Sequence, residues 1–278
     1  MDTRTVDPAS KWVEVSGREK ARLATESVGT GVPFVWGHSL LSSMAQDLDG
    51  GVMAWRDLVD IARVIRFDAR GHGQSENSGE PEDYRWDNLG RSMWQVVDSY
   101  TDEGVVLGGA SMGCATSLYA ACQRPGQVKG LVLVIPPTAW EWREKRKRNY
   151  RIVANIVQFT HALPFRLLGL LRIKRSDDFQ KNMLSIMTRH LARVGPEGVV
   201  GAMRGASLSD LPPREELAKL DMPTLILAWP DDVTHPLEVA EVLHNTMPNT
   251  QLEVMGHVSD PYRWPQLVRE FITSLDQH

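Results

Sequence analysis

The sequence contains little cysteine, since Cys114 and Cys122 are the only two in 278 residues. Eight positions apart on a predicted helix, they share one face but lie about 12 Å from each other, too far for a disulfide. We therefore expect two small core side chains and a reducing, intracellular setting, with the cytoplasm as the default location.

Long apolar runs are also missing. The first eight residues, Met-Asp-Thr-Arg-Thr-Val-Asp-Pro, contain no apolar signal core, and no stretch reaches the length of a membrane-spanning helix. The formal net charge of −4 gives no reason to expect nucleic acid or an anionic membrane surface as a partner. The expected partner is a small-molecule substrate, and the expected oligomeric state is a monomer or a homodimer.

The patterns that hold metals and cofactors are absent as well. His161, His190 and His244 are isolated, and no Cys/His spacing is typical of a zinc site. Neither Gly71-x-Gly73 nor Gly108-Gly109 completes the Gly-x-Gly-x-x-Gly fingerprint of dinucleotide binding, and no phosphate-cradling loop is visible. We therefore expect neither a metal nor a cofactor.

The composition is that of a globular protein with a substantial core, with 42% hydrophobic and 24% charged residues. Strands are predicted over residues 12–15, 22–26, 33–37, 63–68, the apolar run before Ser111, 128–135, 222–228 and 251–255. Helices are predicted over residues 55–62, 88–100, the segment through Cys122, 237–246 and 265–275. The first two strands are expected to form an antiparallel hairpin. The later alternation predicts an α/β fold with a mostly parallel sheet.

This alternation stops between residues 138 and 213. Aromatic, Leu/Met-rich and basic helical segments dominate there, and Pro212-Pro213 closes the stretch. We interpret residues 138–213 as a helical cap inserted after about the sixth strand. Residues 1–137 and 214–278 then form the core domain.

One glycine-rich segment, Gly109-Ala110-Ser111-Met112-Gly113, lies between a short apolar run and a helix-compatible segment. A serine hydroxyl is a poor nucleophile unless its surroundings expose it and a base removes its proton. In the pattern Gly-x-Ser-x-Gly the serine occupies a sharp strand-to-helix turn, and the glycines leave room for the crowded backbone. The sequence therefore predicts Ser111 as a nucleophile. The alternative is a glycine-rich strand end with a solvated serine.

A serine nucleophile needs a base and an orienting acid, and open α/β sheets place such groups at the carboxyl ends of strands. His257 follows the last predicted strand, and Asp231 and Asp232 follow the strand before it. The chain order is then serine, aspartate, histidine. His235 lies in the same loop as the aspartates but lacks the strand-end position, so we expect it to be a surface or helix-entry residue.

Residues 64–75, Val-Ile-Arg-Phe-Asp-Ala-Arg-Gly-His-Gly-Gln-Ser, add a loop of the Arg-Gly-His-Gly type. With this loop, the glycine-flanked serine and the two strand-end segments, the chain resembles the capped, ester- and lactone-hydrolysing members of the α/β-hydrolase fold over residues 12–274. The resemblance implies a mostly parallel sheet of about eight strands, helices on both faces and a helical cap. A branch that hydrolyses oxoadipate enol-lactone has a similar loop, and a similar Ser-Leu pair after the third strand.

The resemblance also implies roles for single residues. Family members carry Gly-x-x-Asp-x-x-x-Pro, and counting back four residues from Pro236 selects Asp232 rather than Asp231 as the acid. A tryptophan stands where the glycine of that pattern is usual. His257 is then expected to take the proton of Ser111, and Asp232 to hold the imidazole ring.

The predicted oxyanion hole uses the backbone N–H of Met112, the residue after the nucleophile. Relatives typically carry His-Gly-x after the third strand, where this chain has His38-Ser39-Leu40. The resemblance implies the Leu40 N–H as second donor, with the Ser39 side chain as a further one. Serine in place of glycine is a departure from the pattern. We expect His38 and His72 to brace their loops.

The substrate pocket is expected within the cap, where aromatic and methionine side chains would line an adaptable apolar cavity. They are Trp140, Phe159, Phe165, Met183, Met187 and Met203. The basic run 143–148 is expected to be the solvated face of a cap helix. The other interpretation is that Arg143, Arg146 or Arg151 faces the pocket and binds a substrate carboxylate.

These observations predict a serine hydrolase that cleaves a small carboxylic ester or lactone through an acyl-enzyme. A C–C bond hydrolase with the same catalytic groups is one alternative. A non-catalytic ligand sensor of the same fold is another, from a different functional class. Haloalkane dehalogenases and epoxide hydrolases place an aspartate at the turn, so Ser111 argues against both.

Overall fold

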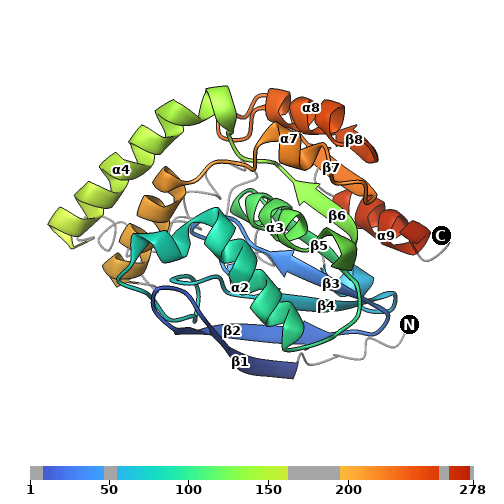
Figure 1. Cartoon of the computed structure of the whole chain (residues 1–278), viewed down its shortest axis with the longest axis horizontal. Helices are drawn as coiled ribbons and strands as arrows, with labels where there is room; N and C mark the ends of the chain where they lie inside the picture. Colours follow the sequence, from blue (N-terminus) through green and yellow to red (C-terminus); the bar gives the residue numbers. More distant parts are fainter. Residues whose placement is uncertain (1–8, 47–54, 162–194, 257–262, 276–278) are drawn as a thin grey trace.

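The computed structural model describes residues 9–46, 55–161, 195–256 and 263–275. At the centre of this described part lies an eight-stranded sheet with the order β1-β2-β4-β3-β5-β6-β7-β8 (Figure 1). β2 pairs antiparallel with both β1 and β4, and the other neighbours are parallel. The predicted α/β fold and its opening hairpin are therefore confirmed.

The elements have the following bounds. The strands are β1 (Ala9–Val15), β2 (Ala21–Val28), β3 (Val32–Gly37), β4 (Ala62–Phe67), β5 (Val105–Ala110), β6 (Val128–Val134), β7 (Thr224–Ala228) and β8 (Thr250–Val254). The helices next to the sheet are α2 (Trp86–Asp98), α3 (Met112–Gln123), α8 (Leu237–Thr246) and α9 (Trp264–Leu275), with the short 3-10 helices η1 (Trp55–Leu58), η2 (Pro81–Tyr84) and η3 (Pro125–Gln127).

Two apolar cores cover the two faces of the sheet. Side chains of α2, α3 and α8 pack on one face, and side chains of η1 and α9 pack on the other. All six residues of β5 are buried because parallel strands in such a sheet are covered on both sides. Cys114 lies buried on α3, where burial raises the pKa of its thiol, which is the behaviour of a core side chain.

The predicted helix over residues 55–62 is shorter than expected. The structure has only η1 there, because the Ile61 N–H closes a turn onto the Leu58 carbonyl and β4 begins at the next residue. The Val59 carbonyl accepts instead from the Thr30 N–H. The turn that leads into β4 therefore ends the helix earlier than the local sequence pattern predicts.

Between β6 and β7 the described chain is helical. It contains η4 (Trp140–Trp142), α4 (Arg143–Thr160), helical residues 195–208 and α7 (Arg214–Leu217). Figure 1 shows α4 and residues 195–208 on the side toward which the parallel strands point. Among the described helices, none has the length and apolar character needed to cross a lipid bilayer.

Candidate active site

Ser111 occupies the sharp turn between β5 and α3. Its backbone has φ 53° and ψ −106°, a left-handed conformation that residues other than glycine rarely adopt. The Ser111 N–H donates to the Val134 carbonyl at 3.0 Å, which extends the pairing of β5 with β6 by one residue. Strained backbone of this kind concentrates at functional sites. Here the strained residue is Ser111, directly after the end of β5.

Glycines make this turn possible by letting two backbones approach. A Cβ atom at Gly109 would lie 2.6 Å from the Cα of Gly113 and 2.6 Å from the carbonyl oxygen of Gly37. A Cβ atom at Gly113 would overlap the same oxygen. The glycines flanking Ser111 are therefore required because α3 begins directly against the end of β3.

His235 lies between Ser111 and Asp232. Its Nδ1 is 2.7 Å from Asp232 Oδ2, and its Nε2 is 2.9 Å from Ser111 Oγ. An ionised carboxylate only accepts hydrogen bonds, so Nδ1 carries the proton and Nε2 presents its lone pair to the Ser111 hydroxyl. This is the tautomer that a general base for Ser111 needs.

Four donors hold the Asp232 carboxylate. Oδ2 accepts from His235 Nδ1 and from Trp229 Nε1, the latter at 3.0 Å. Oδ1 accepts from the backbone N–H groups of Thr234 at 2.7 Å and His235 at 3.3 Å. Burial alone would raise the pKa of Asp232, but these hydrogen bonds and the neighbouring imidazole together hold that pKa below its usual range.

The loop after β7 reaches Ser111 by folding back over the end of β6. The Thr138 N–H donates to the Thr234 carbonyl at 3.2 Å, which fastens the loop to the segment that follows β6. Arg146 of α4 donates to the Val233 carbonyl at 3.2 Å and to Thr234 Oγ1 at 3.0 Å. The His235 N–H closes the turn onto the Asp232 carbonyl, which places both side chains at the same end of the sheet.

The expectation that His235 is a surface residue is wrong. It does precede α8, but only 12% of its side chain is exposed and its ring contacts Ser111. The signal in the sequence is the spacing Asp-x-x-His. The Asp232 carboxylate accepts from backbone N–H groups of its own turn, and this turn brings the side chain three positions later next to the same carboxylate. The sequence prediction for the base, His257, lies outside the described residues.

The loop after β3 offers the predicted oxyanion donors. The Ser39 hydroxyl donates to the Ala110 carbonyl at 3.3 Å, so its hydrogen is already engaged. A turn closes from the Ser42 N–H to the Ser39 carbonyl, and this bond does not use the Leu40 N–H. The N–H of Met112 begins α3, where the helix dipole favours negative charge. The two backbone donors therefore suit the role better than the Ser39 side chain.

Buried histidines support this loop. His38 Nε2 accepts from the Ala69 N–H at 2.9 Å, and His38 Nδ1 donates to the Ser39 carbonyl at 2.8 Å, which ties the loop after β3 to the loop after β4. The His72 ring packs against that of His38 with centroids 5.0 Å apart. Burial, and secondarily His38, lowers the pKa of His72 to about 3.

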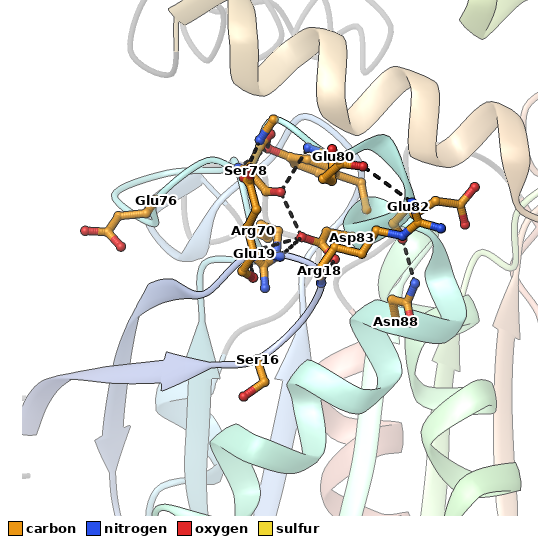
Figure 2. Close-up of polar contacts among 12 residues, drawn as sticks. Ser16, Arg18, Glu19, Arg70, Glu76, Ser78, Glu80, Glu82, Asp83 and Asn88 are labelled. Atoms are coloured by element: carbon orange, nitrogen blue, oxygen red, sulfur yellow. Dashed lines mark hydrogen bonds and ion pairs between the residues drawn. The ribbon is translucent and has the colours of Figure 1, made fainter.

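The Arg-Gly-His-Gly loop is fastened at its other end through Asp83. Figure 2 shows Asp83 among its partners: its carboxylate accepts from the N–H groups of Arg18 at 2.7 Å and Glu19 at 3.0 Å, and from Ser78 Oγ at 2.8 Å. The buried Arg70 lies 3.8 Å from the same carboxylate and donates to the Glu19 carbonyl. This network joins the β1–β2 turn to η2 and serves the fold.

Arg143 does not face a pocket, contrary to one interpretation of the basic run. Its guanidinium is buried and donates to three carbonyls, those of Thr138, Ala206 and Ser209. It also lies 4.1 Å from the centroid of the Trp86 ring. These contacts occupy the guanidinium, so Arg143 joins α4 to residues 206–209 and to Trp86 of α2 and is not available to bind a substrate carboxylate.

The other predicted cap residues are scattered. Trp140 is half-buried and donates from Nε1 to the Pro212 carbonyl, whereas Phe159 is 89% exposed. Met203 is buried beneath α4. Phe165, Met183 and Met187 lie outside the described residues. Within the described ranges, no group of three or more His, Cys, Asp or Glu side chains is arranged to hold a metal.

Comparisons with known proteins identify the family of the fold. A family model described as alpha/beta hydrolase fold matches residues 50–268. The chain is 26% identical over 227 residues to 3-oxoadipate enol-lactonase 1 of Acinetobacter baylyi, covering 77% of this chain and 79% of that protein.

Solved structures show the same fold. An esterase from Thermogutta terrifontis superposes with a TM-score of 0.78 at 23% identity, over 97% of this chain and 99% of that one. The enol-lactonase of Burkholderia xenovorans LB400 superposes with a TM-score of 0.68 at 19% identity, over 91% and 97%. At these identities the two structures establish the likeness of fold.

Proposed function

Because the chain belongs to the α/β-hydrolase fold family, we propose that it is a serine hydrolase that cleaves a small carboxylic ester or lactone. One observation carries the proposal: the Ser111 hydroxyl lies 2.9 Å from an imidazole whose other nitrogen is bound to Asp232. Two histidines are candidates for the base, namely His257, which the family resemblance implies, and His235, which makes this contact.

The mechanism follows from this arrangement. The imidazole removes the proton of Ser111 as the oxygen attacks the acyl carbon, and Asp232 stabilises the imidazolium that forms. The imidazolium then protonates the leaving oxygen as the C–O bond breaks, which leaves an acyl-enzyme. Water, activated by the same imidazole, releases the acid. In a lactone the leaving oxygen stays tethered to the acyl group, so one product results.

Negative charge on the substrate oxygen is stabilised by the backbone N–H groups of Met112 and Leu40. Loss of one such donor costs on the order of 3 kcal/mol in transition-state stabilisation. The donors belong to the start of α3 and to the turn after β3, and Gly37 and Gly113 let these two segments lie in close contact.

The substrate class rests on the chemistry of the site and on relatives. A serine nucleophile next to an imidazole suits acyl transfer, and one relative at 26% identity is named as an enol-lactonase. That similarity is too low to transfer its substrate, so we propose only the class of carboxylic esters and lactones.

Hydrolysis of p-nitrophenyl acetate tests the proposal. Ser111→Ala is expected to lower kcat/KM on the order of 10⁴-fold or more while the melting temperature stays near that of the wild type. Ser117→Ala is the matched control, because Ser117 is buried on α3, the helix that follows Ser111, and its hydroxyl contacts Met93 Sδ. Equal turnover by Ser111→Ala and wild type would refute the proposal.

A further inference from the structure

We propose that Trp229 is a positioning residue of the site, whose indole N–H holds the carboxylate of the acid, Asp232, in the orientation that the catalytic imidazole needs. The inference rests on the proposed serine hydrolase function and holds for either candidate base. The observation behind it is the hydrogen bond from Trp229 Nε1 to Asp232 Oδ2 at 3.0 Å. The family resemblance implies a serine, an aspartate and a histidine for the reaction, so a tryptophan donor adds to that set.

Trp229 is a departure of this chain from the family pattern. The pattern Gly-x-x-Asp has its glycine where this chain has Trp229, three residues before the acid. A glycine offers no side-chain donor, so the contact with the carboxylate comes from the tryptophan. Because Trp229 directly follows β7, the strand fixes the place from which the indole reaches Asp232 within the same turn.

The indole of Trp229 is held in the apolar core that β7 shares with α9. Only 1% of Trp229 is exposed, and its ring stacks on that of Trp264 of α9, with centroids 5.0 Å apart and planes at 19°. The Met255 N–H donates to the Ala228 carbonyl at 2.9 Å, which fastens the end of β7 beside the end of β8. A large buried ring stacked on a second one has little freedom to turn, so its N–H keeps a constant direction toward Asp232.

The indole binds the same carboxylate oxygen that faces an imidazole. Asp232 Oδ2 accepts from Trp229 and from His235 Nδ1, whereas Oδ1 accepts from backbone N–H groups. Burial raises the pKa of Asp232, but hydrogen bonds, led by that of His235 and including that of the indole, lower it. Among the described residues, the titratable groups near this carboxylate are His235 itself and Arg146 of α4, which binds the same loop at Thr234.

Loss of the indole N–H should act on the catalytic imidazole through Asp232. Without this donor the negative charge of the carboxylate is less compensated. An imidazolium beside it is then stabilised, so the base loses its proton at a higher pH and the acid limb of the kcat/KM profile moves to higher pH. The carboxylate also orients the ring less well, which lowers kcat.

The test is a matched pair of substitutions in the two stacked rings. Trp229→Phe removes the N–H but keeps an aromatic ring. We expect it to raise the midpoint of the acid limb for p-nitrophenyl acetate by about half a pH unit or more, and to lower kcat about three- to thirtyfold. Trp264→Phe removes an N–H that has no hydrogen-bond partner within the described residues, and should leave the midpoint unchanged. Equal midpoints in the two variants would overturn the proposal.

Proton–nitrogen NMR of the indole groups tests the contact without substrate. The signals of Trp229 and Trp264 are identified by their loss in the two phenylalanine variants. An N–H that donates to a charged acceptor resonates downfield, so we expect the Trp229 signal to move upfield in Asp232→Asn, and by more than the Trp264 signal moves. A Trp229 signal that does not respond to Asp232→Asn overturns the proposal. Turnover that does not depend on Ser111 would instead refute the hydrolase function, while the indole signal still reports the contact with Asp232.

Discussion

Asp232 contacts the His235 ring, whose Nε2 lies against the Ser111 hydroxyl; under the proposed function its carboxylate sets the tautomer of this ring. Asp232→Asn keeps the shape but replaces an acceptor-only group, so the ring can turn its proton toward Ser111. We expect kcat for p-nitrophenyl acetate to fall on the order of 10³- to 10⁴-fold with little change in KM.

Asp231→Asn is the matched control for this substitution. Asp231 is exposed and has φ 63°, a left-handed conformation that asparagine tolerates well. Its activity should stay within about threefold of wild type, as expected of a surface substitution away from the site. A larger loss of activity in Asp231→Asn than in Asp232→Asn would show that Asp231, and not Asp232, is the acid.

Gly113 is a second position where a single substitution has a predictable effect, here on the stability of the fold. A Cβ there would lie 2.6 Å from the carbonyl carbon of Gly37, so α3 must move away from β3. We expect Gly113→Ala to lower the free energy of unfolding by more than about 2 kcal/mol. Gly126→Ala is the control, because a Cβ at Gly126 meets nothing within 4 Å. Equal denaturant midpoints for the two variants would contradict the close packing.

At the scale of elements, α4 contributes to the site through Arg146, which donates to the Val233 carbonyl and to Thr234 Oγ1. Arg146→Gln should let the turn of Asp232 and His235 shift, and we expect kcat to fall about three- to thirtyfold, since small misplacements of catalytic groups are costly. Arg148→Gln, exposed on the same helix, should leave kcat unchanged. Steady-state kinetics of both variants measure this effect, and identical kcat values would show that the contacts of Arg146 with the loop do not influence the reaction.

Elements with a purely local cause were predictable from the sequence. The run over residues 128–135 has no polar alternation because β6 is covered on both faces, and the serine turn follows from glycines at fixed spacing. The contact of His235 with Ser111 was not predictable from a rule that places bases at strand ends. It depends on a loop that crosses β6 and on a turn capped by Asp232, both of which are tertiary.

The directions of the side chains on α4 were also only partly predictable from the sequence. The basic pattern of residues 143–148 indicates a solvated helix face, which holds for the exposed Arg148. Arg143 is the first residue of α4, and its direction is set by Trp86 and by the carbonyls of Ala206 and Ser209. Partners so distant in sequence leave no trace in a local periodicity.

For the whole molecule, the buried His72 makes stability depend on pH. Its pKa is lowered to about 3, whereas an unfolded histidine titrates near 6.5. Between these values the unfolded chain binds the extra proton, so stability is complete above pH 6.5 and is lost as the pH falls. The contribution of this group reaches about 1.4 kcal/mol per pH unit.

Denaturant unfolding at several pH values between 4.5 and 7 measures this slope. Wild type should lose free energy of unfolding steadily below pH 6.5. His72→Gln, although less stable at pH 7, should show a slope smaller by about 1 kcal/mol per pH unit. Parallel pH profiles for the two proteins would show that His72 is not held neutral by the fold.

Covalent labelling shows whether Ser111 is a nucleophile activated within this fold. The protein is treated with a fluorophosphonate, digested, and analysed by mass spectrometry for the modified peptide. We expect a single adduct on Ser111, absent from Ser111→Ala and formed more slowly in His235→Gln. An unmodified Ser111, or an adduct of equal yield in Ser111→Ala, would contradict it.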